Sequence, residues 1–176
     1  CEITCWIAIG GTSLDLDNVE LLFSQSRFLP IHGNELESGI LNLIKRAKNE
    51  IILCSCEFNS RSDFLLSEVL YEKLKQGVKV SVYGNHKSQL SSFRNAFSSS
   101  NLELFSWEPP SPKSLFHIKA ILVDATYVYI GSANLSQNAM TNSAEWGLTT
   151  NSPDIFKSLK SYLQLLKLNH HFEVVN

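Results

Sequence analysis

The stretch FHIKAILVDATYVYIGSANLS, residues 116–136, decides the fold class of this 176-residue chain. Its two apolar runs, at 121–123 and 128–130, predict two neighbouring strands in the core of a sheet. His117 and Lys119 lie in the first of these predicted strands. Because burial of a lysine costs several kcal/mol unless a partner compensates, the two residues need a chemical reason to be there.

Strand-like and helix-like hydrophobic patterns alternate along the rest of the chain. Runs rich in apolar and β-branched residues predict strands, and apolar residues at helical spacing predict helices. The expected strands are 19–23, 50–58, 78–84, 102–107 and 145–150, and the expected helices are 35–49, 63–76, 87–97 and 154–172. This alternation predicts an α/β fold with a mixed, largely parallel β-sheet flanked by helices on both faces.

The length is typical of one domain with a sizeable core. We assign residues 35–176 to this domain, because they contain most of the alternating elements. Residues 1–34 are acidic and carry little periodicity beyond one short strand. We therefore predict that they form an N-terminal appendage or the remnant of a longer chain.

The net charge of −2 excludes an overtly basic nucleic-acid-binding protein. Six carboxylates and one arginine fall within residues 1–40, so the remainder carries a small positive charge that would tolerate a polyanion. No apolar run is long enough to span a bilayer, so we expect no membrane span. Cys54 and Cys56 are expected to be small core residues, since no Cys or His spacing is typical of zinc. Reduced thiols would fit a cytoplasmic location.

Side chains alternate between the two faces of the strand that contains His117, and this alternation divides its polar residues between the faces. Residues two apart project from the same face of a strand, so His117 and Lys119 point together. Asp124 lies at an odd spacing from His117 and falls on the opposite face of a straight strand. We therefore expect Asp124 to have a structural, hydrogen-bonding role.

Gly131, Ser132 and Asn134 follow the second predicted strand. The glycine lets the backbone approach a ligand closely, while the hydroxyl and the amide offer hydrogen-bond donors. Together with Lys119 they suit a tetrahedral phosphate, and the imidazole of His117 can attack phosphorus or protonate a leaving oxygen. The alternative for Ser132 and Asn134 is an ordinary turn after a strand.

Three further residues are candidates for supporting roles. Glu145 begins the strand 145–150, and its carboxylate could fix the tautomer of the His117 imidazole; the alternative is a solvent-facing strand start. Arg61 and Lys113 lie in predicted loops, where they could contact phosphates of a nucleic acid; the alternative is that they are ordinary solvated residues.

The spacing H-x-K-x4-D-x6-G-S-x-N, from His117 to Asn134, resembles the signature of the phospholipase D superfamily. The resemblance spreads over most of residues 35–172, and the compact single motif is most similar to small bacterial endonuclease-type members. The segment VELLFSQSR, residues 19–27, resembles the lead-in of phospholipase D-like components of anti-phage defence systems.

The resemblance implies a mechanism and a partner. Members with one motif pair as homodimers that share one active site, so His117 of each subunit would meet across the interface. One His117 would form a phosphohistidine, and the other would protonate the leaving group and then activate water. Neither a metal nor another cofactor is implied.

The substrate implied by the resemblance is DNA or RNA, which makes the chain a metal-independent nuclease. One alternative is the same chemistry on a phospholipid. Another is a catalytically idle nucleic-acid-binding subunit of a larger defence complex, against which the intact His117, Lys119 and Asn134 argue.

Overall fold

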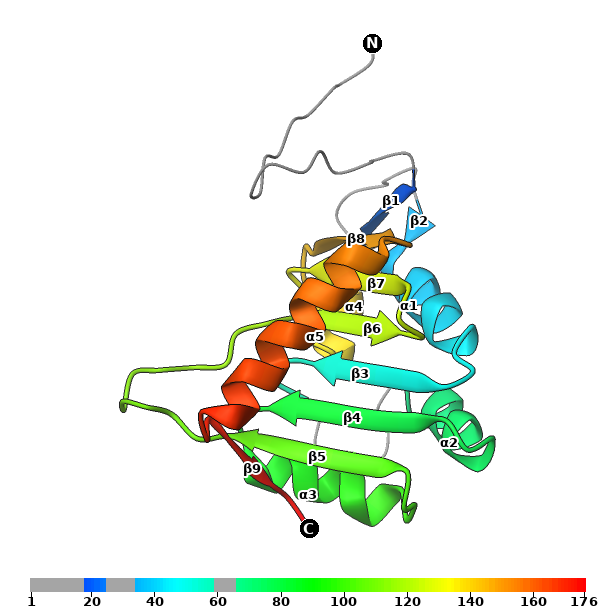
Figure 1. The fold of residues 1–176 in the computed structure, drawn as a ribbon. Helices are drawn as coiled ribbons and strands as arrows, with labels where there is room; N and C mark the ends of the chain where they lie inside the picture. The colour runs from blue at the N-terminus through cyan, green and yellow to red at the C-terminus, as the bar shows by residue number, and fades with distance from the viewer. Residues whose placement is uncertain (1–17, 25–33, 59–65) are drawn as a thin grey trace.

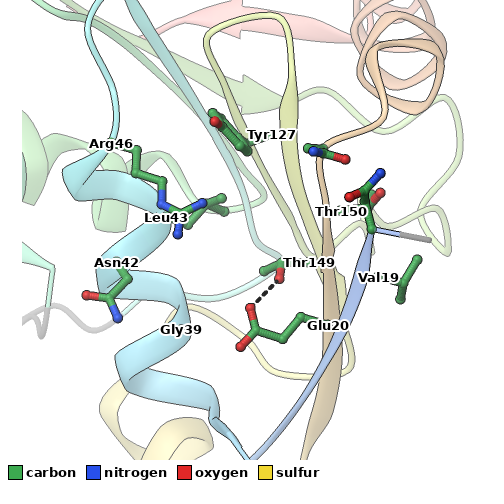
Figure 2. Close-up of a pocket in the computed structure, with 11 residues that line it drawn as sticks. Val19, Glu20, Gly39, Asn42, Leu43, Arg46, Tyr127, Thr149 and Thr150 are labelled. Atoms are coloured by element: carbon green, nitrogen blue, oxygen red, sulfur yellow. Dashed lines mark hydrogen bonds between the residues drawn. The ribbon is translucent and has the colours of Figure 1, made fainter. Parts of the chain in front are cut away.

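The computed structural model describes residues 18–24, 34–58 and 66–176 of the chain. Its strands form one sheet in the order β2-β1-β8-β7-β6-β3-β4-β5-β9 (Figure 1). The strands are β1 (Val19–Phe23), β2 (Asn34–Glu35), β3 (Glu50–Cys54), β4 (Lys79–Gly84), β5 (Leu102–Trp107), β6 (Ala120–Val123), β7 (Tyr127–Gly131), β8 (Trp146–Thr150) and β9 (Phe172–Val174). The helices are α1 (Leu36–Lys45), α2 (Ser67–Lys75), α3 (Lys87–Ala96), α4 (Gln137–Thr141) and α5 (Pro153–Leu168).

The sheet is mixed, as predicted, but the prediction that it is largely parallel is wrong. Only the pairs β1–β2, β3–β4 and β4–β5 are parallel among the pairs formed by the described strands. Parallel pairs need long crossover connections, which α2 and α3 supply between β3, β4 and β5. A short turn after Val123 joins β6 to β7 and permits only an antiparallel pair.

Helices cover both faces of the sheet, which confirms that part of the prediction. Alternate residues of β3 show the two layers: Ile51 and Leu53 belong to a cluster with α1, α2, α3 and α4, whereas Ile52 and Cys54 belong to a cluster with α5. Figure 1 shows α5 crossing one face while the other helices lie behind the sheet. Coverage of the α5 face is therefore thinner.

Strand β1 belongs to this sheet, although it lies within residues 1–34. It pairs antiparallel with β8 along its whole length, with Leu21 opposite Leu148. The remaining parts of that segment, 1–17 and 25–33, lie outside the described residues. The domain boundary at residue 34 stays a prediction.

Strand β6 begins later than the hydrophobic pattern predicts. Its neighbour β3 ends at Cys54, which lies opposite Ala120, so the ladder on that side stops there. His117 and Lys119 therefore precede the strand, with His117 exposed and Lys119 half-buried. Their placement at the end of the strand avoids most of the burial cost that a core position would impose.

No helix within the described segments is long and apolar enough to cross a bilayer.

Candidate active site

Of the polar motif residues, His117, Lys119, Ser132 and Asn134 gather at one edge of the sheet. At this edge β3 and β7 end and β6 and β8 begin, because Ala120 pairs with both Cys54 and Ile130, and Gly131 pairs with Gly147. Backbone pairing continues slightly beyond β6, where the amide of Gly131 donates to the carbonyl of Lys119 over 3.2 Å. Residues on either side of the β6–β7 pair therefore reach the same solvent-facing edge.

His117 and Lys119 contact each other directly. The Nζ atom of Lys119 lies 3.1 Å from Nε2 and 3.3 Å from Nδ1 of His117. An ammonium group can only donate, so the ring nitrogen that it bonds is the unprotonated one. The electron pair of that nitrogen is then engaged by Lys119, so the nitrogen can attack phosphorus only after the ammonium turns to another acceptor, such as a phosphoryl oxygen.

The backbone before His117 is held in place, although the imidazole is exposed. The side chain of Asn85 donates to the carbonyl of Phe116 over 2.8 Å and accepts from its amide over 2.9 Å. The Phe116 ring is buried and packs edge-on against Phe172 at 5.2 Å between centroids. Asn85 and Phe116 therefore position the candidate nucleophile, and neither has a place in the motif.

Ser132 and Glu145 form the next group along the edge. The Ser132 hydroxyl donates to the Glu145 carboxylate and accepts from the amide of Trp146 over 3.1 Å. The amide of Ser132 donates to the carbonyl of Trp146 over 2.9 Å, which joins the two strand ends. Within the described residues Glu145 bonds Ser132 and not His117, so its predicted role in fixing the imidazole stays a prediction.

Asn134 is held by two residues that follow β3. The thiol of Cys56 donates to Oδ1 of Asn134 over 2.9 Å, and Nδ2 of Asn134 lies 3.5 Å from the carboxylate of Glu57. Cys54 is fully buried, as expected, but Cys56 is only half-buried and faces the site. The expectation that Cys56 is a core residue is therefore wrong, and no role was predicted for Glu57. The one signal for Glu57 in the sequence is a charged residue inside the predicted buried strand 50–58.

Gly131 and Gly147 provide room for the ring of Tyr129. A Cβ atom at either glycine would overlap that ring, which is fully buried between them and the α1 side of the sheet. Burial raises the pKa of the Tyr129 hydroxyl, and Glu145 adds to the rise through its negative charge. Tyr129 thus reaches beneath the edge that carries Ser132 and Glu145.

Asp124 lies at the opposite end of β6 from His117. Its carboxylate accepts from the backbone amides of Lys48, Asn49 and Glu50 over 2.6, 2.8 and 2.9 Å. These bonds tie the start of β3 to the turn between β6 and β7. Partial burial would raise the pKa of Asp124, but the three backbone hydrogen bonds outweigh it and the pKa is lowered.

Asp124→Asn is expected to lower the free energy of unfolding by about 2 kcal/mol at neutral pH, because hydrogen bonds to a charged group are the stronger ones. A lowered pKa means that the carboxylate stabilises the fold above its ordinary value of 3.8 and that this contribution is lost as the pH falls below it. Denaturant unfolding of both proteins at neutral pH and at about pH 3 should show the difference shrinking in acid. An unchanged difference would contradict this assignment.

The two residues expected to contact nucleic acid, Lys113 and Arg61, stay predictions. Lys113 is exposed in the segment between β5 and β6 that also carries His117, while Arg61 lies outside the described residues. Across residues 18–24, 34–58 and 66–176, no group of three or more His, Cys, Asp or Glu side chains is arranged to hold a metal ion.

Comparison with known proteins identifies the fold and the family. Residues 40–167 match the family described as cardiolipin synthase, PLD-like domain. The phospholipase D family member Nuc from Salmonella typhimurium has a similar structure, with a TM-score of 0.68 and 21% identity over 89% of this chain and 96% of Nuc. Phosphatidylserine synthase from Haemophilus influenzae Rd KW20 has a TM-score of 0.68 and 20% identity over 93% of this chain and 41% of that protein. These two likenesses show a common fold.

One relative is similar in sequence. The DISARM protein DrmC from Bacillus paralicheniformis (strain ATCC 9945a / NCIMB 11709 / CD-2) is 28% identical over 140 residues, which cover 77% of this chain and 58% of DrmC. The chain therefore spans little more than half the length of this relative. Because the family match covers most of the chain, including every residue from His117 to Asn134, the chain belongs to the PLD-like domain family, as its motif predicted.

Proposed function

We propose that this protein is a metal-independent phosphodiesterase that hydrolyses nucleic acid. The observation that carries the proposal is the gathering of His117, Lys119, Ser132 and Asn134 at one solvent-facing edge of the sheet. An imidazole beside an ammonium, next to a hydroxyl group and an amide, matches the needs of a phosphodiester under attack.

The first step is attack by a ring nitrogen of His117 on phosphorus. A P–N bond forms, the bond from phosphorus to the leaving oxygen breaks, and that oxygen takes a proton from the imidazolium of His117 of the partner subunit. Lys119 and the amide of Asn134 stabilise the negative charge on the phosphoryl oxygens, and the Ser132 hydroxyl, which donates to Glu145 in the structure, would join them by turning its hydrogen to the phosphate.

The second step is hydrolysis of the phosphohistidine. The imidazole of the partner subunit's His117, now neutral, takes a proton from water, and the oxygen of that water attacks phosphorus. The P–N bond breaks, which releases a phosphomonoester and restores His117. The proton that the partner subunit's His117 gave to the leaving oxygen is replaced from water, so the cycle consumes one water molecule and no other reactant.

A defence role supports nucleic acid as the substrate. The resemblance to the DISARM protein DrmC links the chain to a defence system. The alternative substrate is a phospholipid, which is supported by the family description and by the fold shared with phosphatidylserine synthase.

We test the substrate with plasmid DNA, single-stranded DNA and RNA incubated in excess EDTA, with phospholipid vesicles in parallel. Cleavage of at least one nucleic acid that is insensitive to EDTA is the expected result. Hydrolysis of the phospholipid alone would transfer the assignment to the lipid alternative. The absence of hydrolysis of all four substrates would favour the alternative of a catalytically idle subunit that depends on a partner.

An uncovered apolar patch supports the shared homodimeric site. The patch has three members with solvent-exposed fractions of 52% for Leu21, 36% for Ile130 and 53% for Trp146. The strand register places all three on the face that carries α5, since Leu148 lies opposite both Leu21 and Ile130, and Trp146 is two residues before it. Trp146 also bonds Ser132 through its backbone, so the patch is continuous with the site. A second copy seated here would lie next to the strand ends that carry Ser132 and Glu145.

Ile130→Glu is expected to convert the dimer to a monomer and to remove most of the activity, because a charge would be buried at the interface. Sedimentation velocity and a dilution series of activity measure the two effects. Tyr71→Glu is the matched control, since Tyr71 is 50% exposed on α2, which covers the opposite face. A wild-type monomer with full activity at high dilution would refute the shared site.

A further inference from the structure

Two residues outside the motif contact opposite ends of the Asn134 side-chain amide. Cys56 donates its thiol hydrogen to Oδ1 over 2.9 Å, and the carboxylate of Glu57 lies 3.5 Å from Nδ2. We infer that Cys56 and Glu57 are positioning residues that fix the orientation of this amide. The inference rests on the proposed role of Asn134 as a phosphate ligand.

The chemistry of the amide explains why its orientation matters. One end of an asparagine side chain is an acceptor and the other carries two donor hydrogens, and only the donor end can bind a phosphoryl oxygen. The two ends have nearly the same shape, so packing alone does not distinguish them. A rotation of the amide by half a turn would place its oxygen where the phosphate needs a donor.

The partners of Asn134 select one orientation from both sides. Oδ1 accepts the thiol hydrogen, whereas in the reverse orientation the sulfur would serve only as a weak acceptor for Nδ2. An ionised carboxylate can only accept, so Glu57 attracts Nδ2 and would repel Oδ1. Both contacts are therefore better in the same orientation. Glu57 occupies one of the two hydrogens of Nδ2 and leaves the other for a phosphoryl oxygen.

The backbone that carries Cys56 is anchored independently of its thiol. The side chain of Asn85 donates to the Cys56 carbonyl over 3.1 Å, and Ser55 accepts from the amide of Leu135 over 3.0 Å. Phe58 also forms a β-bridge with Leu135. Loss of the thiol hydrogen should therefore change the amide of Asn134 while the surrounding chain keeps its place.

A double-mutant cycle tests the inference with the full chain and bis(p-nitrophenyl) phosphate. Cys56→Ala is expected to lower kcat/KM about tenfold, as loss of one hydrogen bond would, whereas in an Asn134→Ala background it should have less than about a twofold effect. Cys56→Ser, whose hydroxyl can still donate to Oδ1, should stay within about threefold of wild type. Glu57→Ala should cost about threefold, and Glu72→Ala on α2 is the control for loss of an exposed carboxylate.

A second readout separates failure of the inference from failure of the proposed function. Inorganic phosphate is titrated while the side-chain amide resonances of Asn134, assigned by their loss in Asn134→Ala, are followed by NMR. Phosphate should shift them in the wild type and bind several-fold more weakly to Cys56→Ala. If the chemical shifts of these resonances do not change when phosphate is added, the role of Asn134 in the proposed function is overturned. Equal affinity in Cys56→Ala, or an equal loss of kcat/KM in both backgrounds, would overturn the positioning role alone.

Discussion

His117→Asn is expected to reduce phosphodiesterase activity on the order of 10⁴-fold, because the substitution removes the attacking nitrogen and leaves only binding and charge stabilisation. Steady-state rates on the substrate selected by the EDTA assay measure the loss. The imidazole is exposed, so the variant should keep the thermal stability of the wild type.

His170→Asn is the matched control, since it removes an exposed imidazole that follows α5. Asparagine also tolerates the left-handed backbone at this position, where φ is 59°. The control should retain wild-type activity. Comparable activity in His117→Asn would show that this imidazole is not the nucleophile. A trapped phosphohistidine in the wild type, absent from the variant after acid-free quenching, would identify the bonding atom directly.

Gly147→Ala is expected to lower the free energy of unfolding by about 2–3 kcal/mol, which for a chain of this size corresponds to a fall in Tm of about 4–12 °C. The new Cβ would overlap the ring of Tyr129 and lie 2.9 Å from its Cζ and hydroxyl oxygen. Because Tyr129 is fully buried, the ring has no free space to move into. Thermal unfolding followed by circular dichroism measures the loss.

A double substitution tests the cause of that destabilisation. All three nearest neighbours of a Cβ at residue 147 are atoms of Tyr129, so Tyr129→Leu removes the collision. Tyr129→Leu has its own cost, because it leaves a cavity. In that background, however, Gly147→Ala should cost much less than it does in the wild type. If the two changes in the free energy of unfolding are fully additive, the methyl group clashes with the backbone and not with the ring of Tyr129.

Local spacing was sufficient to predict most of the strands and the motif. The expected strand 102–107 coincides with β5, and 19–23 coincides with β1. These predictions succeeded because hydrophobic periodicity reflects which side of an element is buried, and that is a local property. The motif likewise predicted the family, because His117 to Asn134 lie within one hairpin whose register is set by a short turn.

Strand direction was not predictable in the same way. The periodic pattern of β6 does not state whether its neighbour runs parallel or antiparallel, and β6 lies between β7 and β3, which is distant in sequence. The expected extent of the strand failed for the same reason, since β6 begins where β3 provides a partner and not where the apolar run begins.

The sequence by itself thus determined the family and most of the elements, and it contains the motif residues that we propose to attack and bind a phosphate. Only the tertiary structure decided what surrounds them. It placed Cys56 against Asn134, which is 78 residues away in the chain. It also placed Asn85 against Phe116, the residue before His117, which is 31 residues away. It also placed Asp124 at the far end of β6, on the amides that begin β3. The physical reason is that contacts between distant residues follow from which strands become neighbours, and no local pattern in the chain records that choice.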